Sequence, residues 1–308
     1  MELNALRQFM VVARLEHLSR AAEELHVAQP SLSRTIARLE AELGAALFDR
    51  AGRLQLNETG RVFRRYVERS LGELDAGRRA VLDAIAHGGG TVRLASETFL
   101  TLTGPLAAFK RSHPTVEVEL HWAPADDMLR LLRTQEVELC VASQPIYAEG
   151  LMSARLFNDQ VGVATGLDHP LAGRGSVTVD ELAGESFITA RKGHWQRRLL
   201  DRLFAERGLT PKVVCEVDEL SAVADLIVAG LGIGLVPAIA QRIAAHPPLA
   251  WNPIDSSDSR RTVTLFWNAD HELSDPARLM RNTITEWDWT AADPDTQRVA
   301  PPASRTQS

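Results

Sequence analysis

A run of polar side chains between residues 29 and 38 carries the first recognisable chemistry in this chain of 308 residues. Pro30 suits the first turn of a helix, because its missing N–H would have no partner there. The helical period then separates an apolar face from a polar face. The polar face consists of Gln29, Ser31, Ser33, Arg34, Thr35 and Arg38. Such a face has the length and the hydrogen-bonding groups to lie in the major groove of DNA.

These side chains match particular parts of a DNA duplex. The Gln29 amide can pair with adenine through two hydrogen bonds, and Arg34 can bind guanine or a phosphate. Ser33 and the first N–H groups of the helix suit phosphate oxygens. Arg50 and Arg53 flank the Ala51-Gly52 turn and suit a narrow minor groove. By itself, however, a polar helical face is equally consistent with ordinary solvated surface.

Three helices are predicted to position this face. Apolar spacing predicts a first helix over residues 5–16 with Asn4 as its N-cap, and a second helix capped by Ser19. The third begins at Gln29 and ends at Gly44. Two short extended segments over 47–57 then predict a β-hairpin, or wing, with Gly52 supplying a positive φ at its tip.

A long helix is predicted from Glu58 to about residue 87. Val67, Leu71, Leu74, Val81 and Ile85 follow an apolar seam, and a helix of this length extends beyond a core of three small helices. The seam favours pairing with a second copy of the chain, although packing on its own domain remains an alternative. Three glycines at 88–90 predict a hinge.

Strands and helices alternate after the hinge, which predicts parallel sheets covered by helices. Two such units of about a hundred residues each predict a two-lobed α/β domain with a cleft between the lobes. The predicted domains are a winged helix-turn-helix DNA-binding domain over 1–58, a linker and dimerisation helix with a glycine hinge over 59–90, a domain of two α/β lobes over 91–290, and a disordered tail over 291–308.

Composition narrows the function classes. The net charge of the chain is −6, yet residues 29–65 contain seven Arg against four Asp or Glu. Such a local excess of positive charge is typical of a protein that makes a small number of specific contacts with DNA. No apolar run approaches the length of a membrane span, and the N-terminus lacks the pattern of a secretory signal. Cys140 and Cys215 lie in separate apolar runs and are expected to be buried and reduced. The sequence therefore predicts a cytoplasmic protein without a membrane association.

Residues 3 to about 65, from LRQFMVVARLEHLSRAAEELHVAQPSLSRTIARL to LFDRAGRLQLNETG, resemble the N-terminal domain of the LysR-type transcriptional regulators. The resemblance implies that Gln29, Pro30, Ser33 and Arg34 contact DNA and that Arg53 enters the minor groove. Ala28 departs from a Ser cap that is frequent in the family. The segment HPLA at 169–172 and the segment GLGIGLVP at 230–237 continue the resemblance more weakly. They imply a fold like that of periplasmic binding proteins, a small-molecule effector in the cleft, and dimers that pair into tetramers.

Polar residues at strand ends and helix N-termini are the candidates for effector binding. They are Ser96, Thr98, Ser143, Gln144, Thr189, Arg191 and Ser221, with Lys192 and His194 on the same loop as Arg191. The cations favour a small anionic effector, and their simple solvation is the alternative. The glycines of GLGIGL lack the spacing of a nucleotide-binding loop, so close backbone packing is the preferred interpretation.

No catalytic or metal-binding constellation is recognisable, so we expect neither enzymatic activity nor a cofactor. The expected partners are an operator in double-stranded DNA, a small-molecule effector, further copies of the chain, and RNA polymerase. Two other classes of protein are alternatives. A solute-binding protein would share the two-lobed fold but lack residues 1–65, and an α/β enzyme would need a nucleophile or a cofactor loop.

Overall fold

The computed structural model describes residues 1–49, 53–85, 89–218, 222–243 and 249–289. The chain divides into two compact units, one formed essentially by residues 1–86 and the other by the remainder. The predicted tail beyond 290, Arg50 and Ser221 lie outside the described residues. Within the part that is described, no helix combines the length and apolar character needed to span a bilayer.

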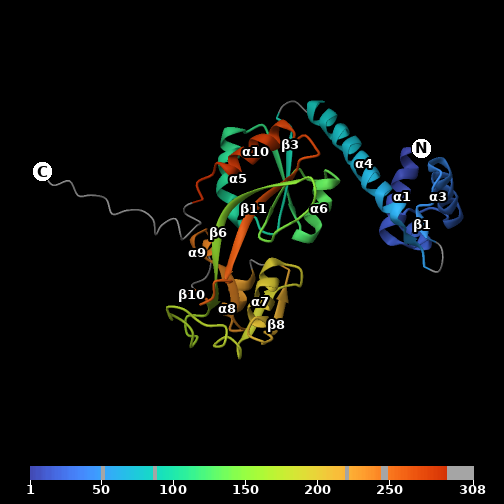
Figure 1. Cartoon of the computed structure of the whole chain (residues 1–308). Helices are drawn as coiled ribbons and strands as arrows, with labels where there is room; N and C mark the ends of the chain where they lie inside the picture. The colour runs from blue at the N-terminus through green and yellow to red at the C-terminus, as the bar shows by residue number, and fades with distance from the viewer. Residues whose placement is uncertain (50–52, 86–88, 219–221, 244–248, 290–308) are drawn as a thin grey trace. The chain divides into compact units, whose positions relative to one another are not determined.

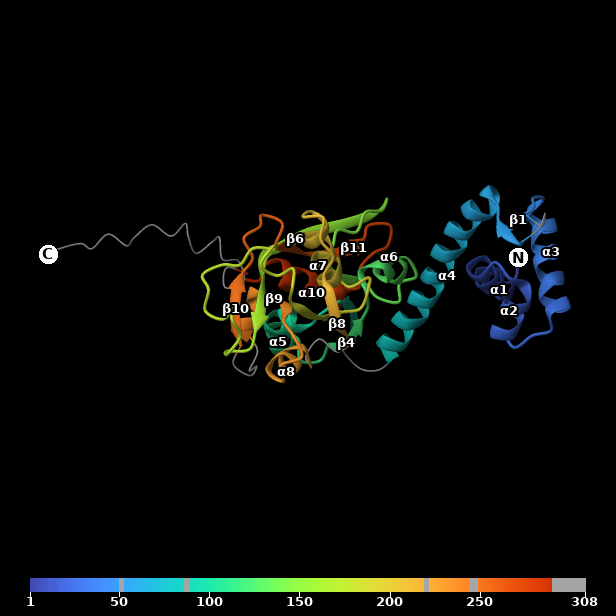
Figure 2. The same ribbon diagram turned by 90° about the horizontal axis from the view of Figure 1, so that it is seen from below.

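The first unit is a winged helix-turn-helix. Its elements are α1 (Leu3–Leu15), α2 (Leu18–Glu24), α3 (Gln29–Leu43), β1 (Phe48–Asp49), β2 (Gln55–Leu56) and α4 (Glu58–Ile85). Strands β1 and β2 pair antiparallel. Figure 2 shows α1, α2 and α3 gathered with β1 at one end of α4. The three helices, the hairpin and the first half of α4 enclose one apolar core.

The start of α3 is predicted correctly, whereas α1 and α2 each begin two residues earlier than predicted and have other caps. Helix α1 begins at Leu3 with Glu2 as N-cap, so Asn4 lies inside the first turn. Helix α2 is capped by His17, whose Nδ1 accepts from the backbone N–H of Arg20 at 3.4 Å. An imidazole nitrogen therefore does what the predicted Ser19 hydroxyl would have done. Gly44 ends α3 in the left-handed conformation, as predicted.

The apolar seam of α4 divides into two parts. Val67 is buried in the winged-helix core, and Leu71 packs against the same core. The Phe63 ring lies 5.2 Å from that of Phe9 of α1. Leu74 and Val81, by contrast, are exposed. The alternative that α4 packs on its own domain is therefore right for its first half, because α1 lies alongside it.

The second unit is a two-lobed α/β domain. Its first-lobe elements are β3 (Thr91–Ser96), the 3-10 helix η1 (Leu100–Leu102), α5 (Thr103–Ser112), β4 (Glu117–Trp122), α6 (Ala125–Arg133), β5 (Leu139–Ala142) and α10 (Asp275–Thr285). The second-lobe elements are β7 (Ser186–Ala190), α7 (Trp195–Ala205), β8 (Lys212–Val217), α8 (Ala222–Val228), β9 (Gly234–Pro237), α9 (Ala238–Ile243) and β10 (Ala250–Pro253).

Two long strands, β6 (Leu151–Thr165) and β11 (Arg260–Asn268), run antiparallel to each other and join the lobes. The first two thirds of β6, residues 151–160, pair with β11, and its last residues pair with β9 and β10. The main sheet follows the order β10-β6-β11-β5-β3-β4. Strands β3, β4 and β5 are mutually parallel, as predicted. The prediction of a wholly parallel sheet is nevertheless wrong, because β11 pairs antiparallel with both β5 and β6.

Alternating side chains bury both faces of the first-lobe sheet. Leu94, Val141 and Leu265 point into a core closed by α5 and α10. Their neighbours Ala95, Cys140 and Phe266 face α6. Figure 1 shows α5 and α10 on one side of these strands and α6 on the other. Near-continuous apolar strands are expected where helices cover both faces.

The second lobe packs α7 and α8 on its strands. Val161 and Phe187 share an apolar core with Leu203 and Phe204 of α7, while Ile188 and Ala164 share a smaller one with Val223 and Ile227 of α8. Gly232 allows the chain to approach β7, because a Cβ there would lie 2.2 Å from the Ser186 carbonyl oxygen. Close packing of the GLGIGL segment is thereby confirmed.

Candidate functional sites

The exposed face of α3 is the first candidate site. Leu32, Ile36 and Leu39 are buried in the winged-helix core. Six of the polar residues predicted to bind DNA lie on the outside: Gln29, Ser31, Arg34 and Arg38 are exposed, and Ser33 and Thr35 are half-buried. Pro30 is also exposed at the start of the helix. The structure thus brings the predicted polar face together on one side of α3.

Local hydrogen bonds orient part of this face. The Nε atom of Arg34 donates to the carbonyl oxygen of Pro30 at 3.3 Å, one turn earlier. The hydroxyl of Thr35 donates to the carbonyl oxygen of Ser31 at 3.2 Å. Arg38 instead lies 3.4 Å from Glu2. Arg34 is therefore held along the surface of α3, and Arg38 is directed toward the N-cap residue of α1.

Three side-chain contacts fix the wing against the helices. The Glu40 carboxylate accepts from the backbone N–H of Leu47 at 2.8 Å, at the entry to β1. The Glu16 carboxylate accepts from the N–H of Leu56 in β2 at 3.0 Å. Asn57 accepts from the N–H of Gly60 at 2.8 Å and so begins α4. Arg53 is exposed on this hairpin, close to the undescribed tip.

The second candidate site is a cavity of about 230 Å³ between the lobes. It is lined by Thr98, Leu100, Thr101, Trp195, Gln196, Val223, Ala224, Val236, Pro237, Ala240, Leu249 and Arg261. Most of these side chains are apolar, and few polar groups converge on the space, as is usual for small-molecule sites. Among the predicted effector contacts that the structure describes, only Thr98 belongs to this lining.

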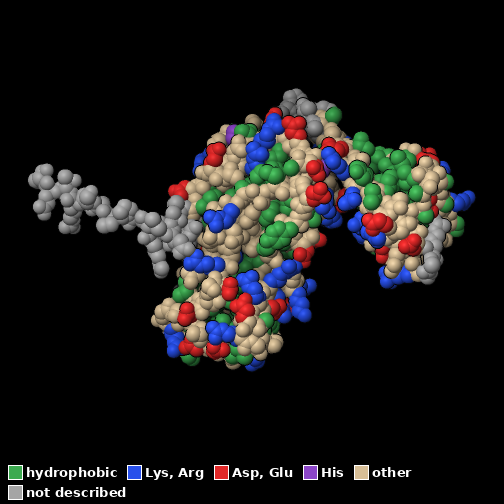
Figure 3. All heavy atoms as spheres, viewed as in Figure 1, with side chains coloured by type: hydrophobic (Ala, Val, Ile, Leu, Met, Phe, Trp, Pro, Cys, Tyr) green, Lys and Arg blue, Asp and Glu red, His purple; other side chains and the backbone are tan. Residues whose placement is uncertain are grey.

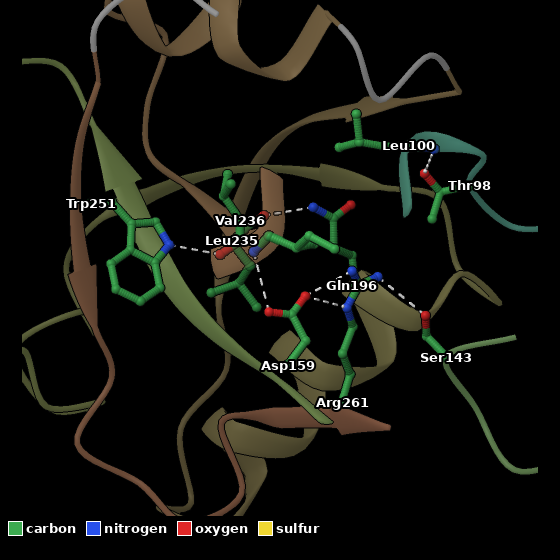
Figure 4. Close-up of polar contacts among 10 residues, drawn as sticks. Thr98, Leu100, Ser143, Asp159, Gln196, Leu235, Val236, Trp251 and Arg261 are labelled. Carbon is green, nitrogen blue, oxygen red and sulfur yellow. Dashed lines mark hydrogen bonds and ion pairs between the residues drawn. The ribbon is translucent and has the colours of Figure 1, made fainter. Parts of the chain in front are cut away.

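Buried polar atoms lie at the start of α7, where Trp195 and Gln196 line the cavity, and at Thr189 of strand β7. Thr189, Trp195 and Gln196 are each at most 6% exposed. The Thr189 hydroxyl, the Trp195 indole N–H and the Gln196 amide oxygen have no hydrogen-bond partner among the described residues. The Gln196 amide nitrogen does donate, to the carbonyl oxygen of Leu235 at 2.6 Å (Figure 4). Buried groups without partners cost free energy, so they favour a ligand here.

A buried ion pair closes one wall of the cavity. Arg261 donates to the Asp159 carboxylate at 2.9 Å and to the Ser143 hydroxyl at 3.2 Å (Figure 4). Asp159 also accepts from the backbone N–H of Ile239 at 3.3 Å. The guanidinium carbon of Arg261 lies 4.5 Å from the centre of the Trp195 ring. The pair thereby links strand β11 to β6 and to the starts of α7 and α9.

The carboxylate of Glu97, between Ser96 and Thr98, occupies the place where the sequence predicted an anionic effector. Its carboxylate accepts from the backbone N–H of Ser143 at 2.9 Å and from the Gln144 amide at 2.7 Å. Burial raises the pKa of Glu97 above its ordinary value, although these hydrogen bonds and the charge of Arg261 oppose the rise. Two of the predicted effector donors are therefore engaged by the chain's own carboxylate.

The remaining predicted effector residues have separate roles. The Ser96 hydroxyl lies 3.0 Å from the carbonyl oxygen of Val141 and so bonds within the sheet. Arg191 is exposed and forms an ion pair of 2.7 Å with Asp218. His194 is buried and caps α7, accepting from the N–H of Gln196 at 3.3 Å. Burial, followed by the charge of Arg261, lowers the pKa of His194 to about 4.

Sequence reasoning missed Glu97, Asp159, Trp195, Gln196 and Arg261. Glu97 lies between two residues that were selected, so its position carried a signal. Arg261 and Asp159 are 102 residues apart, and nothing in the local pattern of either strand indicates their pairing. Among the described residues, no cluster of His, Cys, Asp or Glu is arranged to hold a metal ion. Cys140 and Cys215 are both free, the first buried and the second half-buried.

A winged helix-turn-helix joined to a two-lobed domain with an internal cavity defines a class of protein, the ligand-responsive transcription regulators. Comparison with known proteins identifies the family. Residues 3–61 match the bacterial regulatory helix-turn-helix domain of the lysR family, and residues 86–289 match the LysR substrate binding domain. The chain belongs to the LysR family of transcriptional regulators, in which effector-controlled DNA binding is typical.

Curated relatives span nearly the whole chain. The uncharacterized HTH-type transcriptional regulator YybE of Bacillus subtilis is 34% identical over 92% of this chain and 98% of its own length. The transcriptional dual regulator GltC of the same species is 30% identical over 90% and 94% of the two chains. Both relatives are described as regulators of transcription.

Solved structures share the fold. Full-length BenM covers 93% of this chain and 96% of its own, with 26% identity and a TM-score of 0.56. A full-length variant of OxyR from Pseudomonas aeruginosa covers 92% and 98%, with 21% identity and a TM-score of 0.60. CbnR has also been solved in complex with its target DNA, and its fold matches with a TM-score of 0.58 at 21% identity over 93% of this chain and 99% of its own.

Proposed function

We propose that α3 lies in the major groove of an operator and that the wing reaches the adjacent minor groove. The observation that carries the proposal is the polar face of α3 opposite its buried Leu32, Ile36 and Leu39. The base and phosphate contacts would come from Gln29, Pro30, Ser31, Ser33, Arg34, Thr35 and Arg38, with Arg53 and Arg50 from the wing. Arg50 is proposed on the sequence alone.

A gel shift of the purified protein on its own upstream DNA tests this proposal. Arg34→Ala is expected to weaken the shift by about tenfold or more, because it removes a charge-assisted contact in the groove. Arg14→Ala is the matched control, since Arg14 is also exposed but pairs with Glu24 between α1 and α2. Equal affinities of wild type and Arg34→Ala would refute this docking.

The protein acts as a homo-oligomer in this proposal, with α4 as a pairing helix. Val62, Tyr66, Leu74 and Val81 are large apolar residues exposed on α4, and their spacing places them along one stripe. Water-exposed apolar stripes favour pairing with an equivalent helix. A dimer would present two copies of α3 to half-sites about one helical turn apart, or a multiple of it. Sedimentation would distinguish a dimer from a tetramer.

The effector would occupy the cavity beside Trp195 and Gln196. An apolar body would fill the space between Leu100, Val223 and Val236, which line the cavity. A hydrogen-bond donor on the ligand would satisfy the Gln196 amide oxygen, and an acceptor would satisfy the Trp195 N–H, both of which lack partners among the described residues. These contacts favour an uncharged effector over the anionic one expected from the sequence.

A thermal-shift screen of small metabolites, followed by calorimetry, tests the effector site. A ligand that binds only the folded protein raises its apparent stability. Gln196→Leu is expected to weaken such a ligand about tenfold, whereas Arg191→Ala should leave its affinity unchanged because Arg191 is exposed and paired with Asp218. Loss of affinity in Arg191→Ala alone would place the effector on the loop instead.

Regulation would follow from ligand binding between the lobes. A ligand shifts a conformational equilibrium only as far as its affinities for the two states differ. An effector that binds one arrangement of the lobes more tightly would thus change how the protein binds its operator. Such a regulator would act in the cytoplasm, where it would also contact RNA polymerase. A DNase footprint that is unchanged by a bound effector would contradict this coupling.

A further inference from the structure

A second pocket lies on the other side of Trp195 and Arg261. Its volume is about 490 Å³, within the usual range for small-molecule sites. It is lined by Ser143, Gln144, Pro145, Tyr147, Trp195, Arg198, Leu199, Arg202, Arg260, Arg261, Thr262 and Thr264. It shares only Trp195 and Arg261 with the proposed effector cavity. It is therefore a separate site.

Four guanidinium groups line this pocket. Arg198 and Arg202 are one turn apart on α7, and Arg260 and Arg261 begin β11. The described lining includes no Asp or Glu. In Figure 3, Lys and Arg side chains gather on this face over α7. Arg198 is paired with Asp126, and Arg202 lies 3.9 Å from Glu206.

Arg198, Arg202 and Arg261 have partners outside the lining. Arg261 is already paired with the buried Asp159 through Nε and Nη2. The Nη2 atom of Arg198 donates to the carboxylate of Asp126 in α6. The Nη2 atom of Arg202 donates to the backbone carbonyl of Asp258 at 3.0 Å. A guanidinium has five N–H donors in a fork, so one such contact holds it in place without using its capacity. These contacts thus orient the donors around the pocket.

We propose that this pocket binds a small multivalent anion, such as a polycarboxylate or a phosphate compound. Guanidinium groups bind carboxylates and phosphates through paired hydrogen bonds. Their distribution over α7 and β11 suits a ligand with at least two anionic groups, and the hydroxyl of Thr264 adds a neutral donor, whereas that of Thr262 donates to Asn158. Arg261 and Trp195 line both this pocket and the effector cavity. An anion in the pocket would therefore contact residues that also contact the effector.

Isothermal titration calorimetry of the full-length protein tests the proposal with pyrophosphate and, separately, citrate at constant ionic strength. Saturable binding of one anion per chain is expected. Arg202→Gln/Arg260→Gln should weaken binding by about tenfold or more, because two charge-assisted contacts are lost. Arg174→Gln/Arg207→Gln is the control: it removes the same charge, and these arginines pair on the surface with Glu181 and Asp180.

Two results would overturn the proposal. Heats that never saturate, or that vanish when the ionic strength is balanced with chloride, would show that the arginines are simply solvated. An equal loss of affinity in both double variants would show a response to net charge instead of to this pocket. Arg202→Gln alone provides a milder variant, since this side chain is half exposed, and unchanged affinity in that folded single variant would also count against the site.

Discussion

The guanidinium of Arg261 donates two hydrogen bonds to the carboxylate of Asp159, at 3.1 Å from Nε and 2.9 Å from Nη2. Their side chains are 3% and 0% exposed. A buried charge without its partner is costly, so Asp159→Asn is expected to lower the free energy of unfolding by about 3–5 kcal/mol. Urea unfolding followed by circular dichroism measures the change.

Asp180→Asn is the matched control for this prediction. Asp180 pairs with Arg207 at the surface, with side-chain exposures of 63% and 49%, so its loss should cost less than about 1 kcal/mol. Comparable losses for the two variants would mean that the Asp159–Arg261 pair is no more important than a surface contact.

The buried cap of α7 predicts a pH dependence. Burial and the charge of Arg261 hold the pKa of His194 at about 4, whereas an unfolded histidine titrates near 6.5. Between these values the unfolded chain binds more protons at this residue than the folded one. The free energy of unfolding contributed by His194 is therefore present above about pH 6.5 and is lost as the pH falls towards 4.

His194→Asn isolates this contribution, because asparagine also caps helices but does not titrate. The difference between the wild-type and variant unfolding free energies should fall by about 3 kcal/mol between pH 6.5 and pH 4. Glu97 titrates in both proteins, so its contribution cancels in the difference. Parallel pH curves for the two proteins would contradict a neutral buried His194.

Gly60 is predicted to be required where the wing meets α4. A Cβ at this position would lie 2.1 Å from the carbonyl oxygen of Leu47, so Gly60→Ala must displace the wing and should cost about 1–3 kcal/mol. The same substitution at Gly184 meets no atom within 4 Å and should change stability by less than about 0.5 kcal/mol. Thermal unfolding compares them, and equal midpoints would show that the wing adjusts freely.

Removing the apolar stripe of α4 should weaken self-association. Leu74→Glu puts a charge on a side chain that is 55% exposed in the single chain, and the sedimentation equilibrium should shift about tenfold or more towards monomer. Leu167→Glu is the control, since Leu167 is similarly exposed, at 59%, in the second unit. A Leu74→Glu protein that associates like wild type would exclude α4 as the pairing surface.

Features with a local cause were predictable from the sequence. Helix α3 follows from Pro30, the spacing of Leu32, Ile36 and Leu39, and the terminal Gly44. The hairpin and the alternation of strands and helices likewise follow from short-range patterns. The caps were less predictable, because His17 and His194 perform a task that is more usual for serine or aspartate.

Features that depend on distant residues were not predictable. The continuity of β6 across both lobes depends on pairing with β9, β10 and β11, all far along the chain. The predicted effector donors Ser143 and Gln144 are not available to an anion, because they donate to the carboxylate of Glu97. No spacing rule connects Glu97 to Gln144, since their contact is made only when β3 and β5 lie side by side.

Sequence discrimination by α3 is the most direct test of the proposed regulator. Fluorescence anisotropy would compare binding of the upstream operator with a scrambled duplex of equal length, at one salt concentration. The wild type should prefer the operator by about 10³-fold or more. Gln29→Ala/Arg34→Ala should lose most of that preference while still binding both duplexes weakly. A variant that keeps the full preference would contradict the placement of α3 in the major groove.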